Sequence, residues 1–98
     1  MRAISAVGGA VSAHRRRGKI VDHQSNVPVY VQLADILREM IKSGDLAPHR
    51  ALPTIPSLMH EHDVSDGTVK RAIGILRDEG LVELVRGKGT YVTGPEQR

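Results

Sequence analysis

The sequence predicts a mainly α-helical domain with a small β-hairpin near its C-terminal end. Two observations carry this prediction: apolar residues recur at helical spacing in three stretches, and a glycine-rich turn joins two short runs of strand-forming residues. The 98 residues include no Cys, Phe or Trp, so the core must be built from aliphatic side chains. This length allows a single domain with a modest core. The lack of Cys excludes disulfides, thiolate metal sites and cysteine nucleophiles.

The first predicted helix covers residues 29–43. Its apolar stripe recurs every three or four residues, at Tyr30, Leu33, Leu37 and Ile41. Gly44 ends the helix, because glycine readily adopts the left-handed conformation found at helix C-termini. The loop that follows contains Pro48 and Pro53, which prevent the helix from continuing.

The second and third predicted helices are close together in the chain. The second begins near Thr54, a good N-terminal cap, and Pro56 is tolerated there because it lies in the first turn. This helix ends at about Asp63. Ser65 caps the third helix, which covers residues 65–79. The buried face of the third helix follows the spacing i, i+3, i+4 and i+7, at Val69, Ala72, Ile73 and Leu76.

Two short strands are predicted at residues 81–85 and 90–92. The tetrapeptide Arg86-Gly87-Lys88-Gly89 joins them as a hairpin turn. The elements therefore follow the order helix, helix, turn, helix, strand, turn, strand. Because two helices joined by a tight turn form a helix-turn-helix and the hairpin forms a wing, the expected fold is a winged helix-turn-helix.

The charge of the chain is unevenly placed. Residues 1–27 contain five basic residues and one acid, whereas residues 28–98 contain nine basic and ten acidic residues. We expect residues 1–27 to form a basic, disordered arm, residues 28–93 to form the folded domain, and residues 94–98 to be a short tail. The arm favours a nucleic acid or another polyanion as its partner, and the alternative is a solvated leader with no partner.

Four sequence pieces point to a known family. They are PVYVQLADILREMIKSGDL, the dipeptide LP before the second helix, VSDGTVKRAIGILRDEGLVE and RGKGTYV. Together they resemble the DNA-binding domain of the GntR family of bacterial transcription regulators, from residue 28 to about residue 93. The resemblance implies a winged helix that binds operators, usually as a dimer. It further implies a cytoplasmic regulator of transcription, most often a repressor, whose partner is double-stranded DNA.

The resemblance also places the expected DNA contacts. The third helix would enter the major groove, and the wing tip would touch the minor groove or the phosphate backbone. The positions that match are Thr54 at the second helix, Ser65, Asp66, Gly67, Thr68, Lys70 and Arg71 in the third helix, and Arg86, Gly87, Lys88 and Gly89 in the wing.

The chain departs from the family pattern in several places. Thr54-Ile55-Pro56 stands where the family usually has Ser-Glu-Arg, whose Arg contacts DNA. Asp66 and Gly67 stand where Arg and Thr are frequent, and Asp63 replaces a Gly, so Asp63 must adopt or avoid a left-handed turn. Family members usually continue into an effector-binding or dimerisation domain. We expect no small-molecule effector domain in these 98 residues, so a homodimer or a partner regulator would supply the second half of the operator contact.

Asp66 leaves two interpretations open. Its carboxylate can accept a hydrogen bond from cytosine N4 in the major groove, or it can stabilise the positive end of the helix dipole. Lys70 lies one turn later, where it would pair with Asp66 or meet a phosphate or a guanine. In the wing, Arg86 and Lys88 flank two glycines, a pattern suited to close approach to a narrow minor groove, and a solvated hairpin turn is the alternative.

Other classes of function lack support in the sequence. The five His residues are scattered, and His60 and His62 are two positions apart, so they do not share a helix face. We find no catalytic triad, no paired carboxylates and no phosphate-binding loop, and no apolar run reaches the roughly 18 residues of a membrane helix. We therefore expect neither an enzyme nor a cofactor or metal. The alternative function is a winged helix that binds another protein and has lost operator reading.

Overall fold

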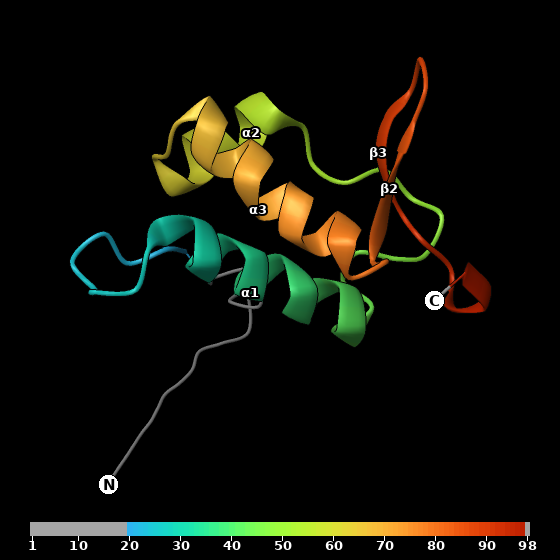
Figure 1. The fold of residues 1–98 in the computed structure, drawn as a ribbon, viewed down its shortest axis with the longest axis horizontal. Helices are drawn as coiled ribbons and strands as arrows, with labels where there is room; N and C mark the ends of the chain where they lie inside the picture. Colours follow the sequence, from blue (N-terminus) through green and yellow to red (C-terminus); the bar gives the residue numbers. More distant parts are fainter. Residues whose placement is uncertain (1–19, 98) are drawn as a thin grey trace, which may run out of the picture.

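The computed structural model describes residues 20–97 of the chain and confirms the expected fold class (Figure 1). The elements follow in the order α1 (Val29–Ser43), α2 (Ile55–His62), α3 (Asp66–Asp78), β2 (Val82–Val85), β3 (Gly89–Val92) and the short 3-10 helix η3 (Pro95–Gln97). Three helices form one body, and the hairpin of β2 and β3 stands beside the C-terminal end of α3. None of the helices in this range is long and apolar enough to cross a membrane.

Local residues set the ends of the helices as the sequence predicts. The Thr54 hydroxyl accepts a hydrogen bond of 3.2 Å from the backbone N–H of Ser57 at the start of α2. Gly44 ends α1 with a φ of 93°, in the left-handed conformation. Asp63 also adopts this conformation, with a φ of 54°, at the C-terminal cap of α2. The backbone here makes the tight turn of the helix-turn-helix and carries the strain of a side chain in that conformation.

The core lies where α1 and α2 pack against α3. Its largest fully buried side chains are aliphatic, as expected from the composition: Leu33, Leu37, Leu58, Val69, Leu76 and Val92. Both α1 and α2 have extensive contacts with α3. The third helix is therefore held rigidly, and its opposite face points to solvent.

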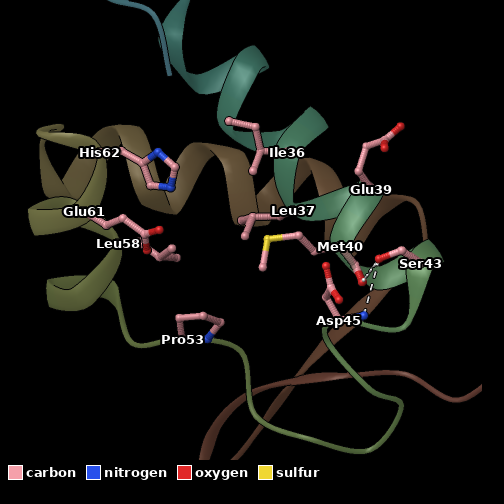
Figure 2. Close-up of a pocket in the computed structure, with 10 residues that line it drawn as sticks. All are labelled: Ile36, Leu37, Glu39, Met40, Ser43, Asp45, Pro53, Leu58, Glu61 and His62. Atoms are coloured by element: carbon pink, nitrogen blue, oxygen red, sulfur yellow. Dashed lines mark hydrogen bonds between the residues drawn. The ribbon is translucent and has the colours of Figure 1, made fainter. Parts of the chain in front are cut away.

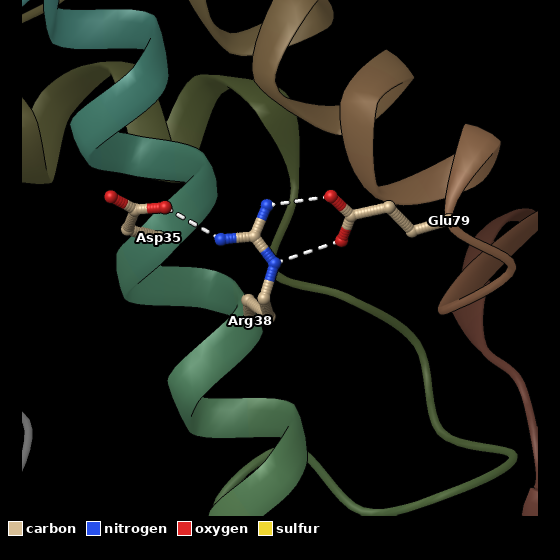
Figure 3. Close-up of polar contacts among 3 residues, drawn as sticks. All are labelled: Asp35, Arg38 and Glu79. Carbon is tan, nitrogen blue, oxygen red and sulfur yellow. Dashed lines mark hydrogen bonds and ion pairs between the residues drawn. The ribbon is translucent and has the colours of Figure 1, made fainter.

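An ion pair crosses from α1 to the end of α3 (Figure 3). The guanidinium of Arg38 donates two hydrogen bonds of 2.8 Å to the two carboxylate oxygens of Glu79. Asp35 accepts a third hydrogen bond from the same group. These bonds raise the pKa of Arg38, and Arg38 in turn lowers the pKa of Glu79. The pair fixes the C-terminal end of α3, from which the wing begins.

The hairpin pairs in an antiparallel register, with Val82 opposite Val92 and Val85 opposite Gly89. A segment of the long loop extends this small sheet. Ala51 pairs with Tyr91, and the N–H of Leu52 donates a 2.9 Å hydrogen bond to the carbonyl of Thr90. No pattern in the sequence predicted this third strand-like segment, which anchors the base of the wing to the body.

Residues 20–27, which the sequence assigned to the disordered arm, pack on the domain. Val21 is buried, and its N–H donates a 3.3 Å hydrogen bond to Nδ1 of His62. The Gln32 side chain accepts from the N–H of Asp22 at 2.7 Å and donates to the carbonyl of Val27 at 2.8 Å. Packing thus begins before Pro28, because an apolar side chain and specific hydrogen bonds hold this segment. Residues 1–19, the remainder of the expected arm, lie outside the described residues.

Candidate nucleic-acid interface

The first turn of α3 presents a polar surface. Ser65 is the N-terminal cap, and its hydroxyl accepts a 3.2 Å hydrogen bond from the N–H of Thr68. The same hydroxyl donates to the Thr68 hydroxyl at 3.1 Å. Ser65, Asp66 and Gly67 are all exposed, and Thr68 is half-buried. A groove or another surface can therefore reach this turn directly.

Asp66 forms an ion pair with Lys70 across one turn of the helix. The Nζ of Lys70 lies 3.3 Å from Oδ2 of Asp66, and more than half of each side chain is exposed. Asp66 also stands in the first turn, where a negative charge suits the helix dipole. The pair neutralises part of the acidic charge at the tip of α3, and it is weak enough for either partner to be drawn to another group.

Gly67 is not required by the fold. A Cβ built on Gly67 would lie 3.9 Å from the Ser65 hydroxyl, an ordinary contact, and the backbone there has no left-handed conformation. The missing side chain therefore leaves space on the exposed surface of the turn. That space suits close approach of a DNA backbone, and the domain itself gains nothing from it.

Arg71 has a partner that the sequence analysis missed. Its guanidinium carbon lies 4.3 Å from the centre of the Tyr30 ring at the start of α1. A cation held over an aromatic face in this way is steadied without losing its charge. Arg71 is exposed and extends the polar surface of α3 towards α1. No pattern along the chain links positions 41 residues apart, so the sequence contained no signal for this contact.

The wing tip carries two exposed cations on a turn that needs glycine. Gly87 and Gly89 have φ values of 78° and 118°, which strongly favour glycine. The turn is closed by a 2.9 Å hydrogen bond from the N–H of Lys88 to the carbonyl of Val85. Arg86 and Lys88 are exposed on this turn, so the tip projects positive charge into solvent.

The two expected contact regions lie on one side of the molecule. In Figure 1 the start of α3 and the turn of the hairpin both lie along the upper side, whereas α1 runs along the lower side. Thr54 is exposed at the start of α2, where its hydroxyl serves as the helix cap. Among residues 20–97, no three His, Asp or Glu side chains are grouped so that they could hold a metal ion. The exposed polar residues of this side thus form a candidate interface composed of a helix and a hairpin.

A protein-family model covers most of this region. The model of the bacterial regulatory proteins of the gntR family matches residues 29–92, which span all three helices and the hairpin. The chain belongs to the GntR family. The resemblance expected from the four sequence pieces is therefore confirmed.

Related proteins of the GntR family place this domain in longer chains. The chain is 45% identical over 65 residues to the mannosyl-D-glycerate transport/metabolism system repressor MngR of Escherichia coli, covering 66% of this chain and 27% of MngR. It is 34% identical over 76 residues to the transcriptional repressor NagR of Bacillus subtilis, covering 78% of this chain and 31% of NagR. The chain thus spans about a third of the length of these curated relatives.

A solved GntR-family domain bound to DNA has the same fold. The DNA-binding domain of AraR in complex with operator ORX1 superposes with a TM-score of 0.69 and is 32% identical. The match covers 76% of this chain and 95% of the AraR domain. The winged helix described above is therefore the architecture of a domain that binds operator DNA in AraR.

Proposed function

We propose that this chain is a sequence-specific DNA-binding regulator of transcription that acts as a repressor. The observation that carries the proposal is the placement of the exposed turn of α3 and the cationic wing tip on one side of the domain. The likeness to the AraR domain in complex with an operator, and to the repressors MngR and NagR, supports it. The proposal assigns the chain no catalytic activity and places it in the cytoplasm, where bacterial DNA is accessible.

In this proposal α3 enters the major groove, which is wide enough to admit an α-helix. The carboxylate of Asp66 would accept a hydrogen bond from cytosine N4, and Lys70 would turn to a phosphate or a guanine. The hydroxyls of Ser65 and Thr68 would bind phosphates and set the register of the helix. Gly67 would let the backbone come close to the DNA.

The wing would supply contacts that depend less on sequence. Arg86 and Lys88 at the exposed tip would lie in the minor groove or along the backbone, where a narrow groove has enhanced negative potential. Arg71, steadied by Tyr30, would reach the backbone beside α3. Thr54, at the exposed start of α2, would contact the backbone as well. The basic residues that precede the described range would add affinity that falls as salt rises.

One module of this size gives limited contact area, so a second copy or a partner regulator is needed for a specific operator. We propose a homodimer that binds two half-sites related by two-fold symmetry. Selection of bound fragments from a random duplex DNA pool, at about physiological salt, tests this directly. An enriched two-fold motif is expected. Weak binding that vanishes with salt and enriches no motif would refute operator reading and favour a winged helix that binds another protein.

Single substitutions separate the roles of α3 and the wing. We expect Asp66→Ala to relax sequence preference more than it lowers affinity, because losing the carboxylate also frees Lys70 for a phosphate. We expect Lys88→Ala to weaken binding to all sequences and to lower the salt slope by about one counterion. Lys42→Ala is the matched control, since Lys42 is exposed and belongs to α1, the helix that runs along the lower side of the domain in Figure 1. If Lys88→Ala and Lys42→Ala bind DNA equally well, the wing assignment fails.

A further inference from the structure

An apolar groove runs between α1 and α2 (Figure 2). Both helices pack on α3 rather than on each other, and α3 passes behind the groove. The resulting cavity measures about 220 Å³. Its apolar lining comes from both helices and the long loop: Ile36, Leu37, Met40, Pro53 and Leu58.

The rim of the groove is acidic. Glu39 on α1, Asp45 in the loop and Glu61 on α2 line it, and all three side chains are exposed. Within residues 20–97, no Lys or Arg lines the groove. An apolar floor with three carboxylates around it favours a partner that carries apolar groups flanked by cations.

A buried donor completes the groove. His62 lines it and is only 2% exposed. Because its Nδ1 accepts the hydrogen bond from the Val21 N–H, a neutral ring carries its proton on Nε2. Burial lowers the pKa of His62, so the ring is neutral near pH 7. Figure 2 shows the ring projecting from α2 towards Leu37 and Leu58, and within residues 20–97 its Nε2 has no hydrogen-bond partner. A buried polar group without a partner calls for an acceptor from outside.

We propose that this groove binds a basic amphipathic helix of a partner protein. The cavity is smaller than the roughly 300–1,000 Å³ typical of small-molecule sites, and it fits one or two apolar anchor side chains of a helix instead. The last turn of such a helix has free backbone carbonyls, one of which would accept from His62 Nε2–H. Lys or Arg residues, which are favoured at that end of a helix, would meet Glu39, Asp45 and Glu61. The inference goes beyond DNA reading, because none of the residues proposed to contact DNA lines this groove.

The methionines offer a direct test. The chain contains Met1, Met40 and Met59. Of the two methionines within residues 20–97, only Met40 lines the groove, while Met59 lies on the same helix as Leu58 and packs against the core. We would label the methionine methyl groups of the full chain with ¹³C and titrate a synthetic helical peptide with Leu at i and i+4 and Lys on its flanks. The methyl signal of Met40 is expected to shift saturably, while that of Met59 stays in place. A peptide with Glu in place of each Lys should leave both signals unchanged.

Charge reversal on the rim sharpens the result. Glu39→Lys and Glu61→Lys change exposed residues, and each should lower the affinity for the basic peptide by about threefold or more. Asp78→Lys, which makes the same change in charge at an exposed position on α3, should leave the affinity unchanged. The proposal fails if the Met40 signal does not move at millimolar peptide, if it moves together with Met59, or if Glu61→Lys binds like the wild type. A Met40 signal that shifts with protein concentration alone would assign the groove to a second copy and also overturn the proposal.

Discussion

His62 should make the stability of this domain depend on pH near neutrality. Its ring is buried at the end of α2, and burial is the main cause that lowers its pKa; nearby His23 adds to the shift, and Glu61 opposes it. Protonation would place a donor on Nδ1, which could then no longer accept from the Val21 N–H. Acidification should therefore release the segment of residues 20–27 and destabilise the fold.

The sign and size follow from proton linkage. The folded state prefers the neutral ring, and the unfolded state binds a proton with a pKa of about 6.5. The contribution of His62 to stability is thus fully present above pH 6.5 and is lost as pH falls below it towards the folded pKa. For one proton the slope is at most about 1.4 kcal/mol per pH unit, so between pH 7.5 and 5.5 the loss is at most about 1.4 kcal/mol. With a urea m-value of about 1 kcal/mol/M, the midpoint should fall by at most about 1.4 M.

Urea unfolding followed by circular dichroism at pH 7.5, 6.5 and 5.5 measures this loss. The matched variant is His62→Gln, because a glutamine oxygen can still accept from Val21 and does not titrate. The exposed His49, which lies 3.0 Å from Glu96, is present in both proteins, so the comparison does not depend on it. Glu79, whose pKa Arg38 lowers, does not titrate above pH 5.5. If His62→Gln loses as much stability as the wild type between pH 7.5 and 5.5, the reasoning is refuted.

Two further substitutions test the body and the tip of α3. Arg38→Ala should destabilise the domain by about 1 kcal/mol, since it removes a bidentate ion pair to Glu79 that is partly open to solvent. Thermal unfolding at low and high salt measures this, and the loss of stability should be smaller at high salt, which screens the pair. Gly67→Ala should stabilise the fold by up to about 1 kcal/mol, because the added Cβ meets only Ser65 at 3.9 Å, and it should weaken DNA binding if the backbone approaches the DNA there. If Gly67→Ala is more stable than the wild type and also binds DNA more tightly, Gly67 has no role in approach to DNA.

The predictable parts of this fold are those set by neighbours in the chain. Gly44, Thr54 and Ser65 end or begin helices through their own backbone conformation or hydroxyl, so their positions could be predicted to within a residue. The turn at Gly87 and Gly89 is local in the same way. The family pattern added what spacing alone does not contain, namely which face of α3 would meet DNA.

The remaining features join distant parts of the chain. Val21 reaches His62 across 41 positions, and Arg71 meets Tyr30 across the same separation. The average composition of residues 1–27, which is basic and rich in glycine, predicts disorder, but the buried Val21 and specific hydrogen bonds hold residues 20–27 on the domain. Such contacts depend on how the helices pack against one another, and the spacing of residue types along the chain does not show this.

The Asp66–Lys70 pair would explain how an acidic residue can stand at the tip of a helix that is proposed to read DNA. In the free protein the two charges satisfy each other at 3.3 Å, so the carboxylate adds little repulsion as DNA approaches. In the proposed complex with DNA, Lys70 would be drawn to a phosphate or a guanine in the major groove, and Asp66 would then need a donor. A cytosine N4 amino group would supply one, and any other base would leave the carboxylate desolvated and unpaired, at a cost of about 1–3 kcal/mol or more. Under this proposal the acid would contribute discrimination rather than affinity, and the cations of the wing would supply the affinity.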